Sequence, residues 1–168
     1  MNIIYSAIGF FQSPHKETKG MPIQPVGARG VRGSILVLPE FREGLLDLDG
    51  FSHVIVLYHL HEIKGSQLRV LPYLDTAEHG IFATRSPKRP NAIGLSVMQL
   101  NGVNEDTVFV ENVDVLDGTP VIDIKPYVPQ FDVWDADRVG WFEGKAQNAS
   151  HHKSDNRFHG GLAVLEQE

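Results

Sequence analysis

The chain has 168 residues, 15 of them basic and 21 acidic, and a formal net charge of −6. This length suits one ordinary domain, and a hydrophobic content of 42% excludes wholesale disorder. The absence of cysteine excludes disulfides, thiolate catalysis and cysteine-ligated metal. The longest apolar run, around residues 54–58, is far too short to cross a bilayer, and the first residues do not resemble a signal peptide. We therefore expect a cytoplasmic protein without a membrane partner.

The acidic total argues against a protein that coats nucleic acid, because such proteins are basic. The charge is unevenly distributed, however. Residues 64–100 carry five basic and two acidic side chains, whereas residues 104–137 carry nine acidic side chains and one lysine. A local basic patch of this kind can still bind phosphate on an acidic protein.

Strand patterns dominate the chain. Residues 33–38 are short and β-branched, and residues 51–60 are so continuously apolar that they predict a central strand buried on both faces. Residues 93–100 form the next apolar run, which ends at Asn101-Gly102, a pair typical of a tight hairpin. Residues 107–116 then predict a strand, and residues 116–124 predict a last hairpin around the turn at 117–120.

Helical patterns are few. Apolar spacing predicts a short helix over residues 40–48 and another over 135–142, with Asp135 as its N-cap. Short strands at this spacing predict an all-β fold, a small closed antiparallel barrel with short helices. We assign residues 1–144 to this barrel domain and residues 145–168 to a polar, loosely ordered C-terminal tail.

Several common site types are absent. The chain has no G-x-G-x-x-G after a strand, no Walker loop, no H-E-x-x-H and no G-x-S-x-G. The strand-rich pattern also lacks the alternating helices of a Rossmann domain. Any nucleotide-like cofactor must therefore be held in another way.

The first cluster with chemical potential is His53, His59 and His61. On one strand these three side chains share a face, and three imidazoles can bind zinc. The alternative is a polar cleft wall, which Glu62 would continue. We expect the cleft wall and no metal.

The segment of residues 80–95 is basic and stiffened by proline. Arg85, Lys88 and Arg89 lie within five residues, beside Pro87 and Pro90. Proline lowers the entropy lost when side chains are presented to a ligand, and guanidinium groups pair with carboxylates and phosphates. A rigid solvated turn is the alternative. We favour a binding role, because a basic loop between apolar strands requires an explanation.

A second polar stretch follows the turn at residues 117–120. Asp123 and Lys125 share one face of a strand, so they form either a structural ion pair or part of a site. The upstream acids Glu111 and Asp114 can accept hydrogen bonds from a ribose or an amino group.

The segment F-A-T-R-S-P-K-R-P-N-A-I-G-L-S, residues 82–96, resembles the TsaA-like family, also called the tRNA methyltransferase O or YaeB-like family. The resemblance extends to I-G-F-F-Q-S-P-H-K-E at 8–17, to Gln24-Pro25, and to G-F-S-H-V-I-V-L-Y-H-L-H at 50–61. It continues in D-V-L-D-G-T-P-V-I-D-I-K-P-Y-V-P at 114–129. Together these motifs span about residues 3–142 in the expected order.

The resemblance implies a small β-barrel that binds S-adenosylmethionine without a Rossmann domain and works as a homodimer. It also implies N6-methylation of a threonylcarbamoyl-modified adenosine next to the anticodon of a tRNA. The implied cofactor residues lie in four segments: Pro25, Val26 and Gly27; His61 and Glu62; Arg85 and Leu95; Glu111, Asn112, Val113 and Asp114.

Methyl transfer needs positioning and exclusion of water, and an acceptor for the leaving proton helps. We take Asp123 as the candidate catalytic acceptor. Candidate tRNA contacts are Lys88, Arg89, Asn91, Lys125 and Tyr127. Any base next to an anticodon is accessible in a loop, which suits recognition by splaying and stacking.

The chain departs from the family pattern in two places. Gln24-Pro25-Val26-Gly27 stands where the family often has Q-P-G-L, and Ala92 replaces a usual proline. The longer bacterial members carry a further C-terminal domain that helps to grip RNA. Two alternatives therefore remain: a methyltransferase of the same fold with a different, small substrate, and a non-enzymatic module that binds cofactor or RNA.

Overall fold

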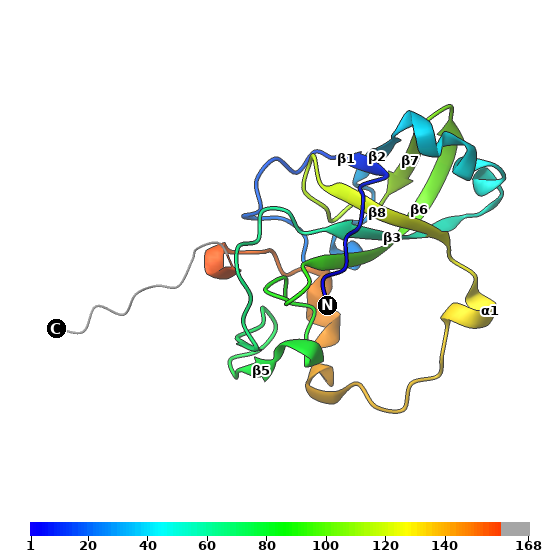
Figure 1. The fold of residues 1–168 in the computed structure, drawn as a ribbon. Helices are drawn as coiled ribbons and strands as arrows, with labels where there is room; N and C mark the ends of the chain where they lie inside the picture. Colours follow the sequence, from blue (N-terminus) through cyan, green and yellow to red (C-terminus); the bar gives the residue numbers. More distant parts are fainter. Residues whose placement is uncertain (159–168) are drawn as a thin grey trace.

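The computed structural model describes residues 1–158 and shows a closed, entirely antiparallel six-stranded barrel (Figure 1). Its strands follow the spatial order β1-β2-β7-β6-β3-β8. Their bounds are Gly9–Gln12 (β1), Arg32–Val37 (β2), His53–His59 (β3), Ile93–Asn104 (β6), Thr107–Glu111 (β7) and Pro120–Pro126 (β8). The predicted all-β barrel is therefore confirmed.

The remaining elements are short. A two-stranded ribbon of β4 (Arg69–Val70) and β5 (His79–Gly80) lies in the long connection between β3 and β6. One α-helical turn, α1 (Pro129–Asp132), follows β8. The described 3₁₀ turns are Pro25–Gly27, Pro39–Leu45, Leu48–Gly50, Ile81–Ala83, Gly140–Phe142, Ala146–Ser150 and Asn156–Phe158.

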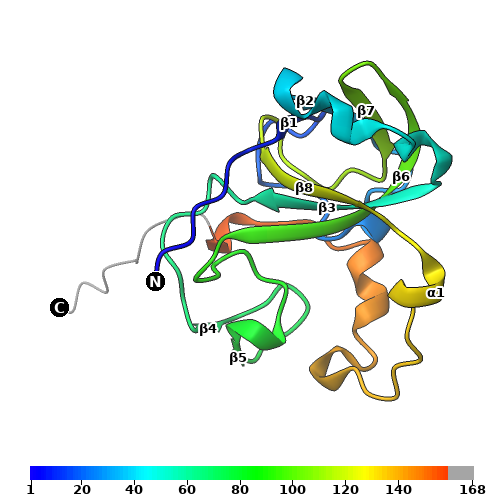
Figure 2. The same ribbon diagram turned by 45° about the vertical axis from the view of Figure 1, so that its right-hand side comes forward.

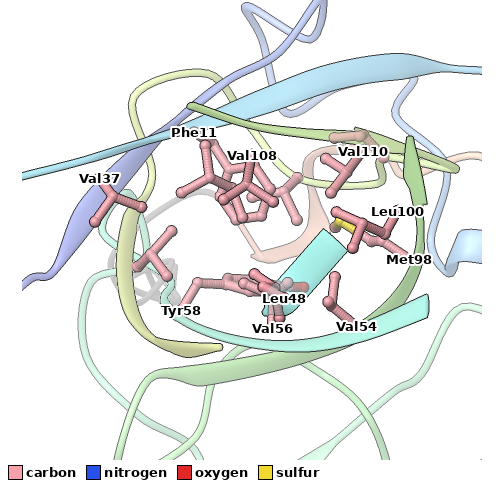
Figure 3. Packing of buried hydrophobic residues seen from close by; sticks show 14 of the residues in the cluster. Phe11, Val37, Leu48, Val54, Val56, Tyr58, Met98, Leu100, Val108 and Val110 are labelled. Carbon is pink, nitrogen blue, oxygen red and sulfur yellow. The ribbon is translucent and has the colours of Figure 1, made fainter. Parts of the chain in front are cut away.

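The core fills the inside of the barrel (Figure 3). On β3 the inward residues Val54, Val56 and Tyr58 are buried, whereas the outward Ile55 and Leu57 are only half-buried. The prediction of a strand buried on both faces was therefore wrong. A barrel strand has one interior face, and apolar side chains on its outer face do not by themselves supply a second layer.

Asn101-Gly102 does not form the predicted hairpin turn. β6 continues through this pair to Asn104, with a register shift between Leu100 and Gly102 that marks a bulge. Gly102 has φ +127°, a conformation that suits glycine in a bulge. The turn to β7 lies later, at Glu105, which has φ +53°.

The predicted last hairpin over residues 116–124 was also wrong. β7 ends at Glu111, where Asn112 turns the chain with φ +69°. The chain then crosses to β8, which pairs with β1 and β3 and not with β7. Local turn residues do not reveal this crossing, because the partner strands lie far away in sequence.

Both predicted helices differ from the structure. The region 40–48 forms two 3₁₀ turns that bury Leu45 and Leu48 at one end of the barrel. Of the region 135–142, only Gly140–Phe142 is helical, so Asp135 caps no helix. The preceding turn α1 instead begins at Pro129, and the Asp132 carboxylate accepts a hydrogen bond from the Val128 amide at 2.6 Å.

The segment of residues 139–158, which we call the strap, returns to the barrel instead of forming a loose tail (Figure 2). Ala149 and Phe158 are buried, and the Ser154 hydroxyl accepts a hydrogen bond from the Met21 amide at 2.9 Å. The expectation of loose order was therefore wrong for residues 145–158. Residues 159–168 of the predicted tail lie outside the described residues, and the division at 144/145 stays a prediction.

Within residues 1–158, no helix is long and apolar enough to cross a membrane.

Candidate functional site

A cavity of about 910 Å³ lies where the barrel meets the loops and the strap. The connection between β3 and β6 and the strap both lie below the barrel in Figures 1 and 2. The cavity has the size of a pocket for a cofactor-sized molecule. Its lining comes from five regions: 18–26, the ends of β3 and β6 with 60–63, the loops at 72–74 and 84–89, the turn at 114–119, and the strap.

The barrel side of the cavity carries a chain of three hydrogen-bonded side chains. The Ser96 hydroxyl donates to Asp114 Oδ1 at 2.7 Å, and the Tyr58 hydroxyl lies 3.0 Å from Ser96 Oγ. Since the Ser96 proton points to the carboxylate, the Tyr58 hydroxyl donates to Ser96. Tyr58 also packs its edge against Phe11, with ring centroids 5.9 Å apart at 87°.

Asp114 is the most electrostatically perturbed acid of the cavity. Burial raises its pKa to about 7, although the hydrogen bond from Ser96 and the charge of Arg85 act in the opposite direction. Burial likewise raises the pKa of Tyr58 far above its usual value, so this hydroxyl stays a donor. Asp114 therefore changes its charge near neutral pH, inside the cavity.

The basic loop contributes three cations with different surroundings. Arg85 is exposed at the cavity, where its Nη1 donates to Gln24 Oε1 at 2.7 Å. Arg89 donates from Nη1 to the carbonyls of Ile81 at 3.1 Å and Thr84 at 2.8 Å. Lys88 is 5% exposed, and its Nζ donates to the Lys64 carbonyl at 2.7 Å. The loop is thus braced from within by Lys88 and Arg89, and Arg85 is the cation that it presents.

The strap supplies an apolar wall and is fastened at two points. At its start, Lys145 and His79 both contact the Asp75 carboxylate, at 2.7 and 2.9 Å, and hold its pKa well below the usual range. Trp141 stacks on His79 with centroids 4.5 Å apart, and its indole N–H donates to the Ala83 carbonyl at 2.7 Å.

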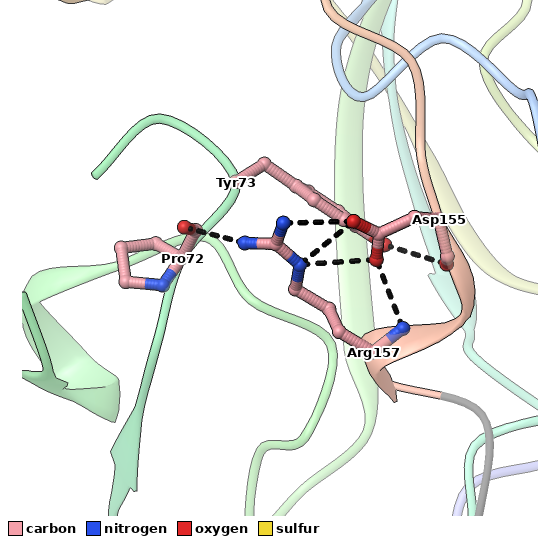
Figure 4. Close-up of polar contacts among 4 residues, drawn as sticks. All are labelled: Pro72, Tyr73, Asp155 and Arg157. Atoms are coloured by element: carbon pink, nitrogen blue, oxygen red, sulfur yellow. Dashed lines mark hydrogen bonds and ion pairs between the residues drawn. The ribbon is translucent and has the colours of Figure 1, made fainter. Parts of the chain in front are cut away.

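The second fastening lies at the end of the strap (Figure 4). The Arg157 guanidinium pairs with Asp155 at 2.7 Å, donates to the Pro72 carbonyl at 3.0 Å, and lies 4.9 Å above the Tyr73 ring. Phe158 packs against Tyr73 with centroids 5.0 Å apart. Aromatic and cationic contacts therefore clamp the strap to the loop that faces the barrel.

The structure brings together about half of the predicted site residues. Those that line the cavity are Pro25, Val26, His61, Glu62, Arg85, Arg89, Leu95 and Asp114. Gly27 lies behind it, on a second, smaller pocket against the strap. The roles assigned to these residues stay predictions.

Other predicted cofactor residues lie away from the cavity lining. Glu111 accepts a hydrogen bond from Asn101 at 3.2 Å and lies 3.5 Å from Arg32. Asn112 accepts from the Gly30 amide at 3.1 Å, and Val113 is fully buried in the core. These three side chains hold the β7 end in place beside Asp114.

The predicted catalytic Asp123 also lies off the cavity. Its carboxylate pairs with Lys125 Nζ at 2.6 Å and accepts from the Ile124 amide at 2.9 Å. Of the two alternatives for Asp123 and Lys125, the structure therefore shows the ion pair. Of the other predicted RNA contacts, Asn91 is exposed, and Tyr127 lies beside His53 with ring centroids 6.1 Å apart.

The fold separates His53 from His61, and His59 is exposed on the outer side of β3. His53 lies on the outer side of β3 and its Nδ1 contacts the Ser52 hydroxyl, whereas His61 follows the strand and lines the cavity 3.5 Å from Glu62. Among residues 1–158 no group of three or more His, Cys, Asp or Glu side chains is arranged to hold a metal.

Sequence reasoning missed Tyr58, Ser96 and the strap residues. Ser96 lies in the quoted motif, and its polar side chain at an inward position of an apolar strand was a usable signal. The pair Trp141-Phe142 in a polar region was a second signal, because tryptophan and phenylalanine are highly buried on average. The contacts of Asp75 and Arg157 that fasten the strap join residues far apart in the chain, so no local sequence pattern indicates them.

The comparisons with known proteins agree with this geometry. Residues 10–133 match the family model described as the tRNA-methyltransferase O N-terminal domain. A probable S-adenosyl-L-methionine-binding protein of Pyrococcus abyssi is 47% identical over 156 residues, which are 93% of this chain and 85% of the relative. The tRNA (adenine(37)-N6)-methyltransferase of Mus musculus is 37% identical over 140 residues, 78% of this chain but 32% of the mouse protein.

Among solved structures, TrmO from Pseudomonas aeruginosa superimposes with a TM-score of 0.70 at 38% identity. The match covers 84% of this chain and 63% of the Pseudomonas chain. This chain thus spans less than two thirds of that protein and about a third of the mouse enzyme. The strap lies beyond the matched residues 10–133. By its sequence match and its barrel, the chain belongs to the tRNA-methyltransferase O N-terminal domain family.

Proposed function

We propose that this chain is an S-adenosylmethionine-dependent tRNA (adenine-N6)-methyltransferase. The observation that carries the proposal is the cavity at the barrel end, which joins Arg85, Asp114 and an apolar wall in a member of this family. The names of the relatives, a cofactor-binding protein and a tRNA methyltransferase, support both halves of the proposal.

The residues of the cavity fit the chemistry of the cofactor. S-adenosylmethionine combines an aromatic base, a ribose, a zwitterionic amino acid and an electrophilic methyl group on a sulfonium. Arg85 suits the carboxylate, because a guanidinium forms paired hydrogen bonds with it. Leu95, Val26 and the strap offer apolar surface for the base. Asp114 supplies negative charge for a cationic group.

Replacing Arg85 by alanine should weaken S-adenosylmethionine binding by about 1.5–3 kcal/mol, the usual value of a hydrogen bond to a charged group. Calorimetry measures this loss directly. Arg32→Ala is the matched control, because Arg32 is an exposed cation away from the cavity. Equal affinity in the Arg85 variant and the control would remove Arg85 from the cofactor site.

We further propose that the acceptor is a threonylcarbamoyl-modified adenosine beside the anticodon and that the protein works in the cytoplasm, where tRNA is abundant. Arg85 presents a cation at the cavity, and Lys125 lies exposed on β8, paired with Asp123. Because Lys88 and Arg89 brace the loop, we expect their joint replacement by alanine to disturb the cofactor site as well as RNA binding.

The experiment that tests the function is transfer of a labelled methyl group from the cofactor to bulk tRNA. Label in tRNA supports the proposal. Label only in small acceptors would favour a same-fold methyltransferase of small substrates, and binding without any transfer would favour a non-enzymatic module.

We also propose a homodimer. The outer faces of β3 and β6 carry Leu57 and Leu95 as register partners, and Leu95 is 51% exposed at the mouth of the cavity. Phe131 and Trp134, which follow β8, are also exposed. A second copy would cover such apolar surface. Light scattering at micromolar concentration should give twice the chain mass, and a monomer mass would overturn the proposal.

A further inference from the structure

Two acidic side chains line the cavity, and they lie in different surroundings. The Glu62 side chain is 58% exposed beside His61, at the mouth. Asp114 lies at the barrel side, where burial disfavours its charged form. The carboxyl is half-buried, and a cationic ligand group would offset the cost of its ionisation in the cavity.

The protein already satisfies part of the hydrogen bonding of this carboxyl. Ser96 is 2% exposed and donates to Asp114, and behind it Tyr58, 7% exposed, donates to Ser96. Because the ring of Tyr58 packs against Gly94 and Phe11, the Tyr58 hydroxyl cannot move away from Ser96 without repacking. The Asp114 carboxylate is therefore oriented, and it receives its donor from the barrel instead of from the ligand.

Such a group suits a cation that cannot donate a hydrogen bond. The sulfonium of S-adenosylmethionine has a full positive charge and no N–H or O–H group. Its ammonium is a donor and lies one carbon from the carboxylate, so an Arg85–carboxylate pair would keep it beside Arg85, and Glu62 is the other acid of the lining that can accept from it. After transfer the sulfonium becomes a neutral thioether, which has no electrostatic attraction to a carboxylate.

Building on the proposed function, we propose that Asp114 is the counter-charge for the cofactor's sulfonium. Ser96 and Tyr58 are the positioning residues that hold it. The cavity then binds the cationic cofactor more tightly than the neutral thioether product, which favours product release.

The titration of Asp114 makes this proposal measurable. Its pKa lies near 7, the groups that act on it are Arg85 and the hydrogen-bonded Tyr58–Ser96 pair, and the other charged or titratable groups of the cavity lining are Arg89, His61 and Glu62. Below this pKa the carboxyl is neutral, so a sulfonium must expel the proton on binding. Cofactor affinity should therefore rise with pH through 7 and level off above, whereas thioether affinity should stay flat.

The experiment is calorimetry with S-adenosylmethionine and S-adenosylhomocysteine at pH 6 and pH 8, without tRNA. We expect the cofactor to bind about tenfold more tightly at pH 8, since each pKa unit corresponds to a tenfold change in affinity. The Asp114→Asn variant should lose this pH dependence and most of its preference for the cofactor. Ser96→Ala should move the midpoint to higher pH, because the carboxylate loses a donor.

Ser34→Ala is the matched control, since Ser34 is a buried barrel hydroxyl that donates to Gln12 at 2.9 Å, away from the cavity. The His61→Gln variant removes the imidazole from the cavity lining. The pH dependence of cofactor binding that remains in this variant is assigned to Asp114. Calorimetry of the unaltered protein in two buffers of different ionisation enthalpy shows whether cofactor binding releases a proton. This measurement tests the proposal even if a variant does not fold.

Equal pH dependence for both ligands would place the ammonium at Asp114 and overturn the proposal. Cofactor binding that is independent of pH would overturn it as well. If neither ligand binds, the protein does not use S-adenosylmethionine. Both the proposed function and this inference are then wrong.

Discussion

Gly94→Ala should destabilise the protein by about 3 kcal/mol or more and abolish cofactor binding. A Cβ at this position would lie 2.1 Å from Tyr58 Cε2 and 2.5 Å from Cζ, far inside van der Waals contact. The Tyr58 ring cannot yield easily, because it is packed on Phe11 and bonded to Ser96. Overpacking in a rigid core costs about 1–3 kcal/mol and occasionally more.

Urea unfolding measures the loss of stability, and calorimetry measures the cofactor. The double variant Gly94→Ala with Tyr58→Ala relieves the clash, so it should be more stable than the sum of the two single effects predicts. Gly44→Ala is the control, because its Cβ would meet no atom within 4 Å. Equal stability of the Gly94 and Gly44 variants would contradict the packing described here.

Phe158→Ala should release the end of the strap and weaken cofactor binding at least tenfold. Phe158 is 4% exposed and packs with Val70, Ile81 and Tyr73 outside the barrel. Loss of a buried phenylalanine costs about 3–5 kcal/mol where the site cannot collapse. Because this cluster is separate from the barrel core, we expect local opening of the cavity wall and not global unfolding.

Hydrogen exchange should show this difference, with faster exchange in residues 139–158 and unchanged protection in β3 and β6. Trp134→Ala is the matched control, since Trp134 is 83% exposed. If Phe158→Ala binds the cofactor as well as the control does, the strap is not part of the cofactor site.

The sequence predicted the barrel because strands of alternating or continuous apolar residues recur at short intervals. It misplaced connections that depend on partners far away. Asn101-Gly102 has the composition of a turn, yet the pairing of β6 with β7 makes it a bulge. In the same way, the turn at residues 117–120 follows a crossing to β1 and β3, which no local pattern encodes.

In the candidate site, too, the residues in motifs were predicted and those that depend on distant contacts were not. Arg85 and Asp114 were predicted from motifs, and both line the cavity. Asp123 was chosen because it shares a face with Lys125, and that proximity is used for an ion pair. The chain after residue 144 was expected to be loose because its composition is polar, but its few apolar side chains, the Lys145–Asp75 pair and the contacts of Arg157 with Pro72 and Tyr73 fasten it.

The most direct test of the account is to map the methyl group on the tRNA. Bulk tRNA is incubated with the protein and isotope-labelled S-adenosylmethionine, digested to nucleosides and analysed by mass spectrometry. We expect the label on N6 of the threonylcarbamoyl-modified adenosine, and we expect Arg85→Ala to reduce it at limiting cofactor. Label on another nucleoside, or no label in tRNA although the cofactor binds, would contradict this expectation.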